Sequence, residues 1–178
     1  MSPARSSVGK IEAYERAGGE GFALREGEPV LYLGAAQGQR AARIVDDAAG
    51  PVVAVEKSPV AALSLIGAAE ERTNLVPYVG DARHPGTYAP LVPELGLLFQ
   101  DVAQPDQVDI FLANLDRFQP RRALLAVKAP SIAVDRPPEA VFEQARDRIA
   151  ERARVREVVD LDPTHDDHAM IVAEPTEA

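Results

Sequence analysis

A glycine-bearing turn, set between a short hydrophobic run and a later carboxylate, is the feature of this chain best suited to chemistry. Val30–Leu33 has the character of a buried strand, and it breaks into Gly34-Ala35-Ala36-Gln37-Gly38. A second hydrophobic run begins at Val52 and stops on Glu56. Glycines let the backbone approach a ligand, the helix that follows offers free N–H groups, and an acid at this place binds ribose hydroxyls. The spacing therefore predicts a site for a nucleoside cofactor.

The form of the turn distinguishes between two such cofactors. Its Gly-x-x-x-Gly spacing lacks the Gly-x-Gly-x-x-Gly pattern that is typical of NAD-binding folds. This difference favours S-adenosylmethionine (SAM) over NAD. The simpler alternative is an ordinary strand–turn–helix unit that is followed by an acid by chance.

The elements that must position this turn alternate along most of the chain. Strands are expected at 30–33, 52–56, 74–79, 93–100, 121–128, 156–161 and 169–173, and helices at 7–17, 39–48, 59–71, 104–114 and 139–154. Ser58 before Pro59 is a typical helix start. The second helix is expected to turn four side chains inward: Ala41, Ala42, Ile44 and Val45. We expect an N-terminal helix and loop over 1–27 and one domain over 28–178.

Strands separated by single helices predict an α/β, Rossmann-like fold with a mostly parallel sheet and helices on both faces. Ligands of such sheets bind at the carboxyl ends of the strands. Residues with no evident packing role fall at those predicted ends: Gly34, Glu56, Asp81, Asp101 and Lys128. We therefore expect them to line one site.

Composition sets limits on the function. The absence of cysteine excludes disulfides, thiol catalysis and cysteine-ligated zinc. No apolar run is long enough to span a membrane, and the first residues lack the apolar stretch of a signal peptide, so we expect a cytoplasmic protein. The net charge of −9 repels polyanions, whereas a stand-alone nucleic-acid binder is more often basic.

Several collinear stretches between Glu28 and Val172 resemble the fibrillarin-like family of SAM-dependent RNA 2′-O-methyltransferases. The most specific is Gln100-Asp101-Val102-Ala103-Gln104-Pro105, and the others lie at 30–36, 74–82, 126–132 and 167–170. The resemblance implies a class I methyltransferase fold with an antiparallel last strand, SAM as cofactor, and RNA presented by a guide ribonucleoprotein and a scaffold protein. It also implies no metal and a role in rRNA processing.

The resemblance assigns parts of the cofactor to particular residues. It implies that Gly34, Ala35 and Ala36 line the methionine part, Glu56 binds the ribose hydroxyls, and Asp81 and Ala82 contact the adenine. Asp101 and Gln104 would lie near the sulfonium, and Gly38 is expected to bind the cofactor as well.

The catalytic set of the family is Lys-Asp-Lys-His, and Asp101, Lys128 and His168 match its last three members. Methyl transfer from a sulfonium is an in-line displacement in which positioning contributes most of the rate. A ribose hydroxyl is a poor nucleophile, and a lysine or a histidine can take its proton. Simpler interpretations remain open: Lys128 reaching solvent, Asp101 capping the helix at 104–114, and His168 belonging to a polar loop that has no metal-ligand spacing.

The chain also departs from the family pattern. Ser7 stands where the first catalytic lysine is expected, and Lys10, one helical turn later, is expected to reach the site instead. Arg40 lies in a pair that is Thr-Thr in the family, so it would bind the carboxylate of SAM. Pro130 replaces an arginine suited to a phosphate contact. The sequence begins close to the predicted methyltransferase fold, so we expect no counterpart of the small β-rich domain that precedes this fold in the family.

Three functions are compatible with these observations. The favoured one is an RNA 2′-O-methyltransferase that depends on partners for its substrate. The acidic charge and Pro130 favour a divergent SAM-dependent enzyme with a small-molecule or other non-RNA acceptor, and the third is a non-catalytic SAM-binding subunit. The arginines at 146–156 are interleaved with acids, which favours a salt-bridged surface over a phosphate contact. The sequence leaves the oligomeric state open.

Overall fold

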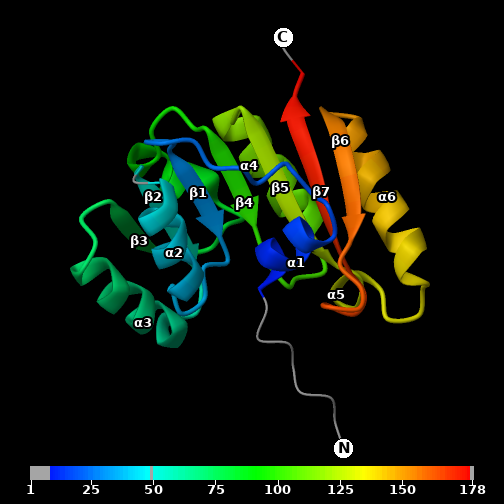
Figure 1. Cartoon of the computed structure of the whole chain (residues 1–178), viewed down its shortest axis with the longest axis horizontal. Coiled ribbons are helices and arrows are strands. Elements are labelled where there is room, and N and C mark those ends of the chain that lie inside the picture. Colours follow the sequence, from blue (N-terminus) through cyan, green and yellow to red (C-terminus); the bar gives the residue numbers. More distant parts are fainter. Residues whose placement is uncertain (1–8, 49, 177–178) are drawn as a thin grey trace, which may run out of the picture.

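One seven-stranded sheet organises the computed structural model, which describes residues 9–48 and 50–176. The strands lie in the order β3-β2-β1-β4-β5-β7-β6 (Figure 1). All neighbours are parallel except β7, which runs antiparallel to both β5 and β6. The strands are β1 Val30–Leu33, β2 Val52–Glu56, β3 Leu75–Val79, β4 Leu97–Gln100, β5 Arg122–Lys128, β6 Ala153–Asp160 and β7 His168–Pro175.

Helices cover both faces of this sheet (Figure 1). They are α1 Lys10–Arg16, α2 Gln39–Ala48, α3 Pro59–Glu70, α4 Gln107–Phe118, α5 Ala129–Ile132 and α6 Pro138–Ala150, with 3₁₀ turns at Pro85–Thr87 and Ala89–Leu91. The core on one face includes side chains of α1, α2 and α3, and the core on the other includes side chains of α4 and α6. None of the helices in the described part of the chain is long and apolar enough to cross a membrane.

The central strands are buried on both faces, which explains their continuous apolar sequences. Leu31 and Leu33 of β1 point toward the core beneath α4 and α6. Val30 and Tyr32 point toward the core beneath α1 and α2. The alternation of side chains along each strand thus fixes which face each strand-end residue approaches.

The mostly parallel α/β fold and the antiparallel last strand are confirmed. The bounds of β1, β2 and α2 agree with the sequence-based ones. Ser58 caps α3, because its hydroxyl accepts a hydrogen bond from the N–H of Ala61 at 3.3 Å. The four side chains expected to point inward from α2 are all buried: Ala41, Ala42, Ile44 and Val45.

Other boundaries were wrong. The helix predicted at 139–154 ends at Ala150, because the alternating side chains from Ala153 onward pair with β7 as a strand. The helix predicted at 104–114 begins only at Gln107, because residues 104–106 form a turn, and it continues to Phe118. The strand predicted at 93–100 is shorter in the structure, where β4 covers only Leu97–Gln100. The helix predicted at 7–17 corresponds to α1, and positions 7 and 8 lie outside the described residues.

A buried ion pair fixes the segment that connects α1 to β1. Both guanidinium nitrogens Nη1 and Nη2 of Arg122 lie 2.8 Å from the carboxylate oxygens of Glu28, whose side chain is almost fully buried. Arg122 also donates to the carbonyl oxygen of Gly21 at 2.9 Å. Gly96 has no room for a side chain here, because an added Cβ would lie 2.4 Å from Cγ of Glu28. The pair therefore holds the N-terminal segment against β5.

Substitution Glu28→Ala should lower the free energy of unfolding by about 3–5 kcal/mol, because it leaves the largely buried Arg122 guanidinium without its carboxylate. Urea denaturation would measure the change. The surface variant Arg146→Ala serves as control and should stay within about 0.5 kcal/mol of the wild type. An equal loss in both variants would contradict a special role for the buried pair.

Candidate active site

A cleft of about 230 Å³ opens at the carboxyl ends of the central parallel strands. The turn after β1, the end of β2, the loop after β3 and the loop after β4 all contribute to its lining. The predicted cofactor residues that line it are Gly34, Ala36, Glu56, Asp81, Ala82, Asp101 and Gln104. The strand-end positions found in the sequence are thus brought together, as parallel strands require.

The turn after β1 depends on left-handed backbone conformations. The φ angles of Gly34, Ala36 and Gly38 are 81°, 49° and 82°. A Cβ on Gly34 would lie 2.4 Å from the carbonyl oxygen of Asp101, and one on Gly38 would lie 2.9 Å from Cα of Leu65. Gly38 is buried beneath the turn and does not line the cleft. Its contribution is therefore to the conformation of the turn. Ala36 adopts a conformation that is strained for a residue with a side chain, as is common at functional sites.

Ala35 is likewise buried, and it packs in the core beneath α1 and α2. Of the predicted cofactor residues, Ala35, Gly38 and Arg40 are absent from the lining of the cleft. The first two support the turn by packing, so any part they have in binding a cofactor is through the backbone that they position.

Backbone N–H groups hold the Glu56 carboxylate at the edge of the cleft. One oxygen accepts from Ala36 and the other from Ser58, each at 2.7 Å. The carboxylate therefore connects the turn after β1 to the start of α3. Each carboxylate oxygen can accept more than one hydrogen bond, so both remain able to accept from a vicinal diol such as the ribose hydroxyls. These acceptor oxygens and the tight glycine turn fit the nucleoside part of SAM.

A network of ion pairs orders the side of the cleft that the loop after β3 forms. The Asp81 carboxylate accepts from Lys57 Nζ at 2.8 Å, and Arg83 donates to both carboxylate oxygens of Asp106 at 2.7 Å. The hydrogen bond from Lys57, with further contributions from the backbone N–H and the charge of Arg83, lowers the pKa of Asp81 to about 2. Sequence reasoning missed Lys57 and Arg83. Two signals were available for Lys57: its position directly after Glu56, and the scarcity of lysine in the chain.

The side chain of Lys10 forms an ion pair with Asp101, which lines the cleft. Both side chains are largely shielded from solvent. A catalytic role of Lys10 stays a prediction. The helix α1 is held in place by Tyr14, which is fully buried and whose hydroxyl donates to Glu157 of β6 at 2.5 Å. Ser7 lies outside the described residues, and its alignment with the first lysine of the family stays a prediction.

Lys128 and His168 are direct neighbours across the antiparallel pair of β5 and β7. His168 interacts electrostatically with both Lys10 and Asp101. The four residues predicted to be catalytic therefore lie together beside the cleft, although they come from four different elements or loops. The interpretation of Asp101 as a helix cap was wrong, because α4 begins only at Gln107 and its capping position is Asp106. His168 is the first residue of β7 and not part of the preceding loop.

Burial, reinforced by the positive charge of Lys10, lowers the pKa of His168. Its Nδ1 lies 2.7 Å from the carbonyl oxygen of Asp166, which can only accept, so Nδ1 carries the proton of the neutral ring. This hydrogen bond leaves Nε2 as an acceptor. Within the described residues, no group of three or more His, Asp or Glu side chains is arranged to hold a metal ion.

Two buried glutamines that sequence reasoning missed fix the backbone beneath this centre. Oε1 of Gln107 accepts from the N–H of Lys128 at 3.0 Å, and its Nε2 donates to the carbonyl oxygen of Gln104 at 2.9 Å. Gln100 donates to the carbonyl oxygen of Gln107 at 2.7 Å. The end of β5 is thereby tied to the loop after β4, which carries Asp101.

Arg40 lies outside the cleft and pairs with Glu12 of α1 at 2.9 Å. Arg43 binds the other oxygen of the same carboxylate at 3.0 Å. Gly9 leaves space for this arrangement, since an added Cβ would lie 1.6 Å from Nη2 of Arg40. In this structure Arg40 anchors α1, and its contact with a cofactor carboxylate stays a prediction.

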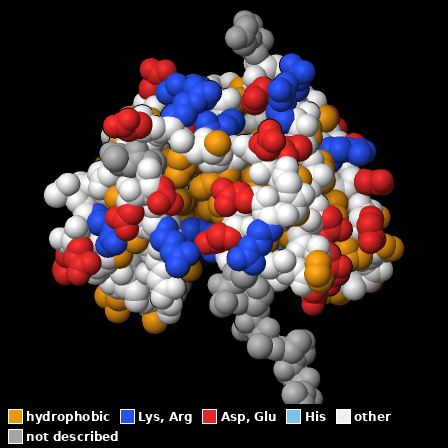
Figure 2. Space-filling view, viewed as in Figure 1, with side chains coloured by type: hydrophobic (Ala, Val, Ile, Leu, Met, Phe, Trp, Pro, Cys, Tyr) orange, Lys and Arg blue, Asp and Glu red, His pale blue; other side chains and the backbone are white. Residues whose placement is uncertain are grey.

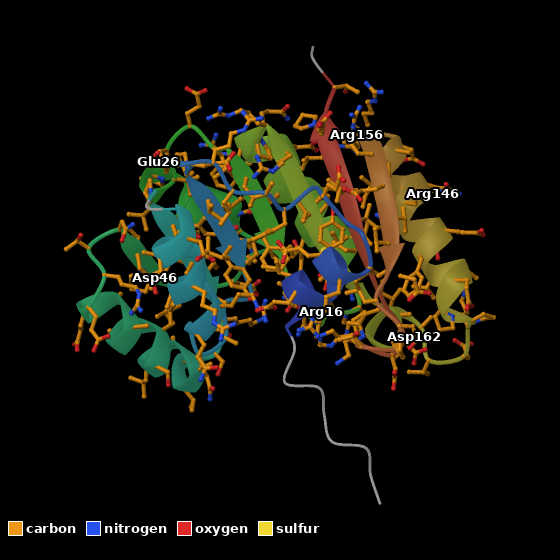
Figure 3. The ribbon with its side chains drawn as sticks, viewed as in Figure 1. Arg16, Glu26, Asp46, Arg146, Arg156 and Asp162 are labelled. Carbon is orange, nitrogen blue, oxygen red and sulfur yellow. The ribbon has the colours of Figure 1, made fainter. Side chains whose placement is uncertain are left out.

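The arginines between 146 and 156 are mostly paired with acids, which confirms the salt-bridged interpretation. Arg146 pairs with Asp147 at 2.8 Å, Arg152 with Asp116 at 2.6 Å, and Arg156 with Glu174 at 3.7 Å. Figure 3 shows Arg146 on α6 and Arg156 at the upper end of β6, both away from α1.

Substitution Lys57→Ala should raise the pKa of Asp81 from about 2 toward its ordinary value of 3.8, because the largest stabilising contact of the carboxylate is lost. Carboxyl-carbon NMR titration measures this shift directly. In the wild type, the contribution of Asp81 to stability is present above its unfolded pKa and is lost as the pH falls through the folded value. Arg43→Ala, which removes a cation outside the cleft, should leave the titration of Asp81 unchanged. An unaltered titration in Lys57→Ala would contradict the assignment.

Comparisons with known proteins agree with this geometry. The family model for fibrillarin matches residues 2–177. Fibrillarin-like rRNA/tRNA 2′-O-methyltransferases from Methanopyrus kandleri and Haloarcula marismortui are 40% and 39% identical, over 93% and 97% of this chain and 73% and 80% of those proteins.

Two solved structures have the same fold and related sequences. The fibrillarin of a fibrillarin/Nop5p complex superimposes with a TM-score of 0.89 at 33% identity, over 94% of this chain and 81% of that one. Aeropyrum pernix fibrillarin with natively bound S-adenosyl-L-methionine superimposes with a TM-score of 0.82 at 35% identity, over 92% of this chain and 74% of that one. With the family match over nearly its whole length and this close overall structural agreement, this chain belongs to the fibrillarin family.

Proposed function

We propose that this protein transfers the methyl group of SAM to a ribose 2′-hydroxyl of RNA. The observation that carries the proposal is the gathering of Lys10, Asp101, Lys128 and His168 beside a cleft whose edge presents the Glu56 carboxylate. A site that binds only the cofactor has no need of two lysines and a neutral histidine at this place. The family membership supports the same reaction.

The residues of the cleft have the chemistry to hold SAM. Glu56 would accept from the ribose hydroxyls, Asp81 and the backbone at Ala82 would contact the adenine, and Asp101 would place a negative charge near the sulfonium. When bound, SAM supplies an electrophilic methyl group. The related fibrillarin from Aeropyrum pernix was solved with natively bound SAM, which supports this assignment.

The chain's own residues would orient the acceptor hydroxyl and take its proton. Asp101 holds the Lys10 side chain at the end of β4, and Lys128 projects from the neighbouring end of β5. These two cations stabilise negative charge that develops on the attacking oxygen. His168 stays neutral because burial and Lys10 lower its pKa, so its Nε2 can accept the proton.

Partner molecules would supply most of the binding to RNA. The net charge is −9, and most of the arginines at 146–156 are paired with acids. A protein of this charge gains little from phosphate contacts alone. The likeness to the fibrillarin of a fibrillarin/Nop5p complex supports a scaffold protein as one such partner. A guide RNA that selects the target is the second partner that we propose.

Substitution Glu56→Ala should weaken SAM binding by at least about tenfold, because each charge-assisted hydrogen bond to a ribose hydroxyl contributes about 1.5–3 kcal/mol. Isothermal titration calorimetry of the purified chain would measure the affinity. Glu70→Ala, which removes an exposed acid of α3, is the matched control and should bind as the wild type does. Equal affinities of Glu56→Ala and the wild type would remove Glu56 from the cofactor site.

Substitutions Lys10→Ala and Lys128→Ala should each lower the turnover of guide-directed RNA methylation by about 10²–10³, with little change in SAM affinity. The reason is that both cations would act on the acceptor oxygen rather than on the cofactor. The control is Arg16→Ala, which removes an exposed cation from the same helix as Lys10.

This assay also separates the candidate functions. Full turnover in Lys10→Ala would make its ion pair with Asp101 purely structural. Methylation of free nucleosides without methylation of guide-bound RNA would identify a small-molecule acceptor. SAM binding without transfer to either acceptor would identify a non-catalytic subunit.

A further inference from the structure

The helix α3 exposes a row of large apolar side chains that its own fold leaves uncovered. Val60, Leu63 and Ile66 are 79%, 70% and 40% exposed, and this row is called the α3 ridge below. Residues 59–69 include no charged side chain, yet α3 fully buries only Ala62 and Leu65. Figure 2 shows hydrophobic side chains gathered at the lower left, where α3 lies. A helix that is apolar on all sides is typical of a buried element, so this surface fits a contact with another molecule.

Small residues lie beside the ridge on the same helix. Ser64, Gly67 and Ala68 line a groove of about 430 Å³ between α2 and α3. A Cβ added to Gly67 would meet nothing within 4 Å, so the helix backbone is open to close approach there. Because the ridge and the small residues belong to one helix, two copies can place the ridge of each against the small residues of the other. Such self-complementarity is the requirement of a two-fold symmetric interface.

The charges at the two ends of α3 select the direction of that contact. Lys57 precedes the helix and is 65% exposed, although it also binds Asp81. Glu70 and Glu71 end it, and Glu71 is 81% exposed. Arg72 makes two hydrogen bonds to Asp46 and also pairs with Glu71 at 3.6 Å. Negative charge still dominates at this end, because Asp46, Glu70 and Glu71 outnumber the one arginine. Antiparallel helices bring the lysine end of each copy to the glutamate end of the other, whereas parallel helices would oppose like charges.

We propose that α3 packs antiparallel against α3 of a second copy of this chain, about a two-fold axis that passes between Leu63 and Ser64. In this register Val60 of one copy lies level with Gly67 of the other. A large side chain therefore meets the glycine of α3, which has no side chain. The two Leu63 side chains lie next to each other at the axis, and Lys57 lies level with Glu70. No residue of the α3 ridge lines the cleft, although Lys57 at the end of the contact does. The contact is a separate proposal from the methyl transfer, because its test is the oligomeric state alone.

One helix from each copy makes a small interface, so the dimer should be weak and depend on concentration. Sedimentation velocity of the full chain from about 1 µM to about 1 mM should show a monomer–dimer equilibrium. Leu63→Glu should raise the dissociation constant at least about tenfold by placing two carboxylates at the axis. Val134→Glu is the matched control, since Val134 is 88% exposed but lies far along the chain from α3, and it should dimerise as the wild type does.

The absence of cysteine allows a second test that reports the register. Leu63→Cys should form a disulfide-linked dimer under mild oxidation, and Val134→Cys should remain largely uncrosslinked. The double substitution of Glu70→Lys with Glu71→Lys should weaken the dimer by opposing Lys57. A wild-type chain that stays monomeric over the whole concentration range overturns the proposal. This is the result expected if α3 is covered by a different protein instead of a second copy. A dimer that Leu63→Glu leaves intact overturns it as well.

Discussion

The close approach of Gly34 to the carbonyl oxygen of Asp101 is the constraint on which the site depends. An added Cβ would lie 2.4 Å from that oxygen, so no other residue type fits between the ends of β1 and β4. The same approach bends the chain after β1 into its left-handed turn, which presents the Ala36 N–H to Glu56. It also fixes Asp101 where the side chain of Lys10 reaches it. The cofactor side and the acceptor side of the site thus share one backbone contact.

The position of the Lys10 side chain depends on contacts of α1 that lie outside the cleft. Its helix buries Ile11, Ala13 and Tyr14 beneath the sheet, and Glu12 accepts from Arg40 and Arg43 of α2. The helix α1 is thus held both by apolar packing and by directional hydrogen bonds to the two arginines. A short helix of seven residues is unstable by itself, so the position of Lys10 is a product of tertiary packing.

The sequence predicted those parts of the molecule that local patterns determine. Continuous apolar strands, the glycine turn and the Ser58 cap each have a short-range cause, and the residues at the strand ends follow from the parallel sheet. The resemblance in turn allowed Lys128 and His168 to be named together before their pairing across β5 and β7 was known.

Long-range contacts could not be predicted in the same way. The salt bridge of Arg83 to Asp106 and the links made by Gln107 join segments far apart in sequence, and their side chains follow no periodicity. The boundary between α6 and β6 was misjudged because alternating arginines and glutamates suit an exposed helix as well as an edge strand. Arg40 was assigned to the cofactor from its place after the turn, and its pairing with Glu12 depends on how α1 docks.

The hydrogen bond from Tyr14 to Glu157 has a further consequence for the dynamics of the site. Glu157 follows a bulge in β6, and β6 is an edge strand with a neighbour on one side only. Edge elements open by local unfolding more readily than central strands, because fewer contacts must be broken. Each opening of β6 would release Tyr14 and with it one restraint on the helix that carries Lys10. The rate at which amide hydrogens of β6 exchange with solvent would therefore report how often this restraint on the helix is lost.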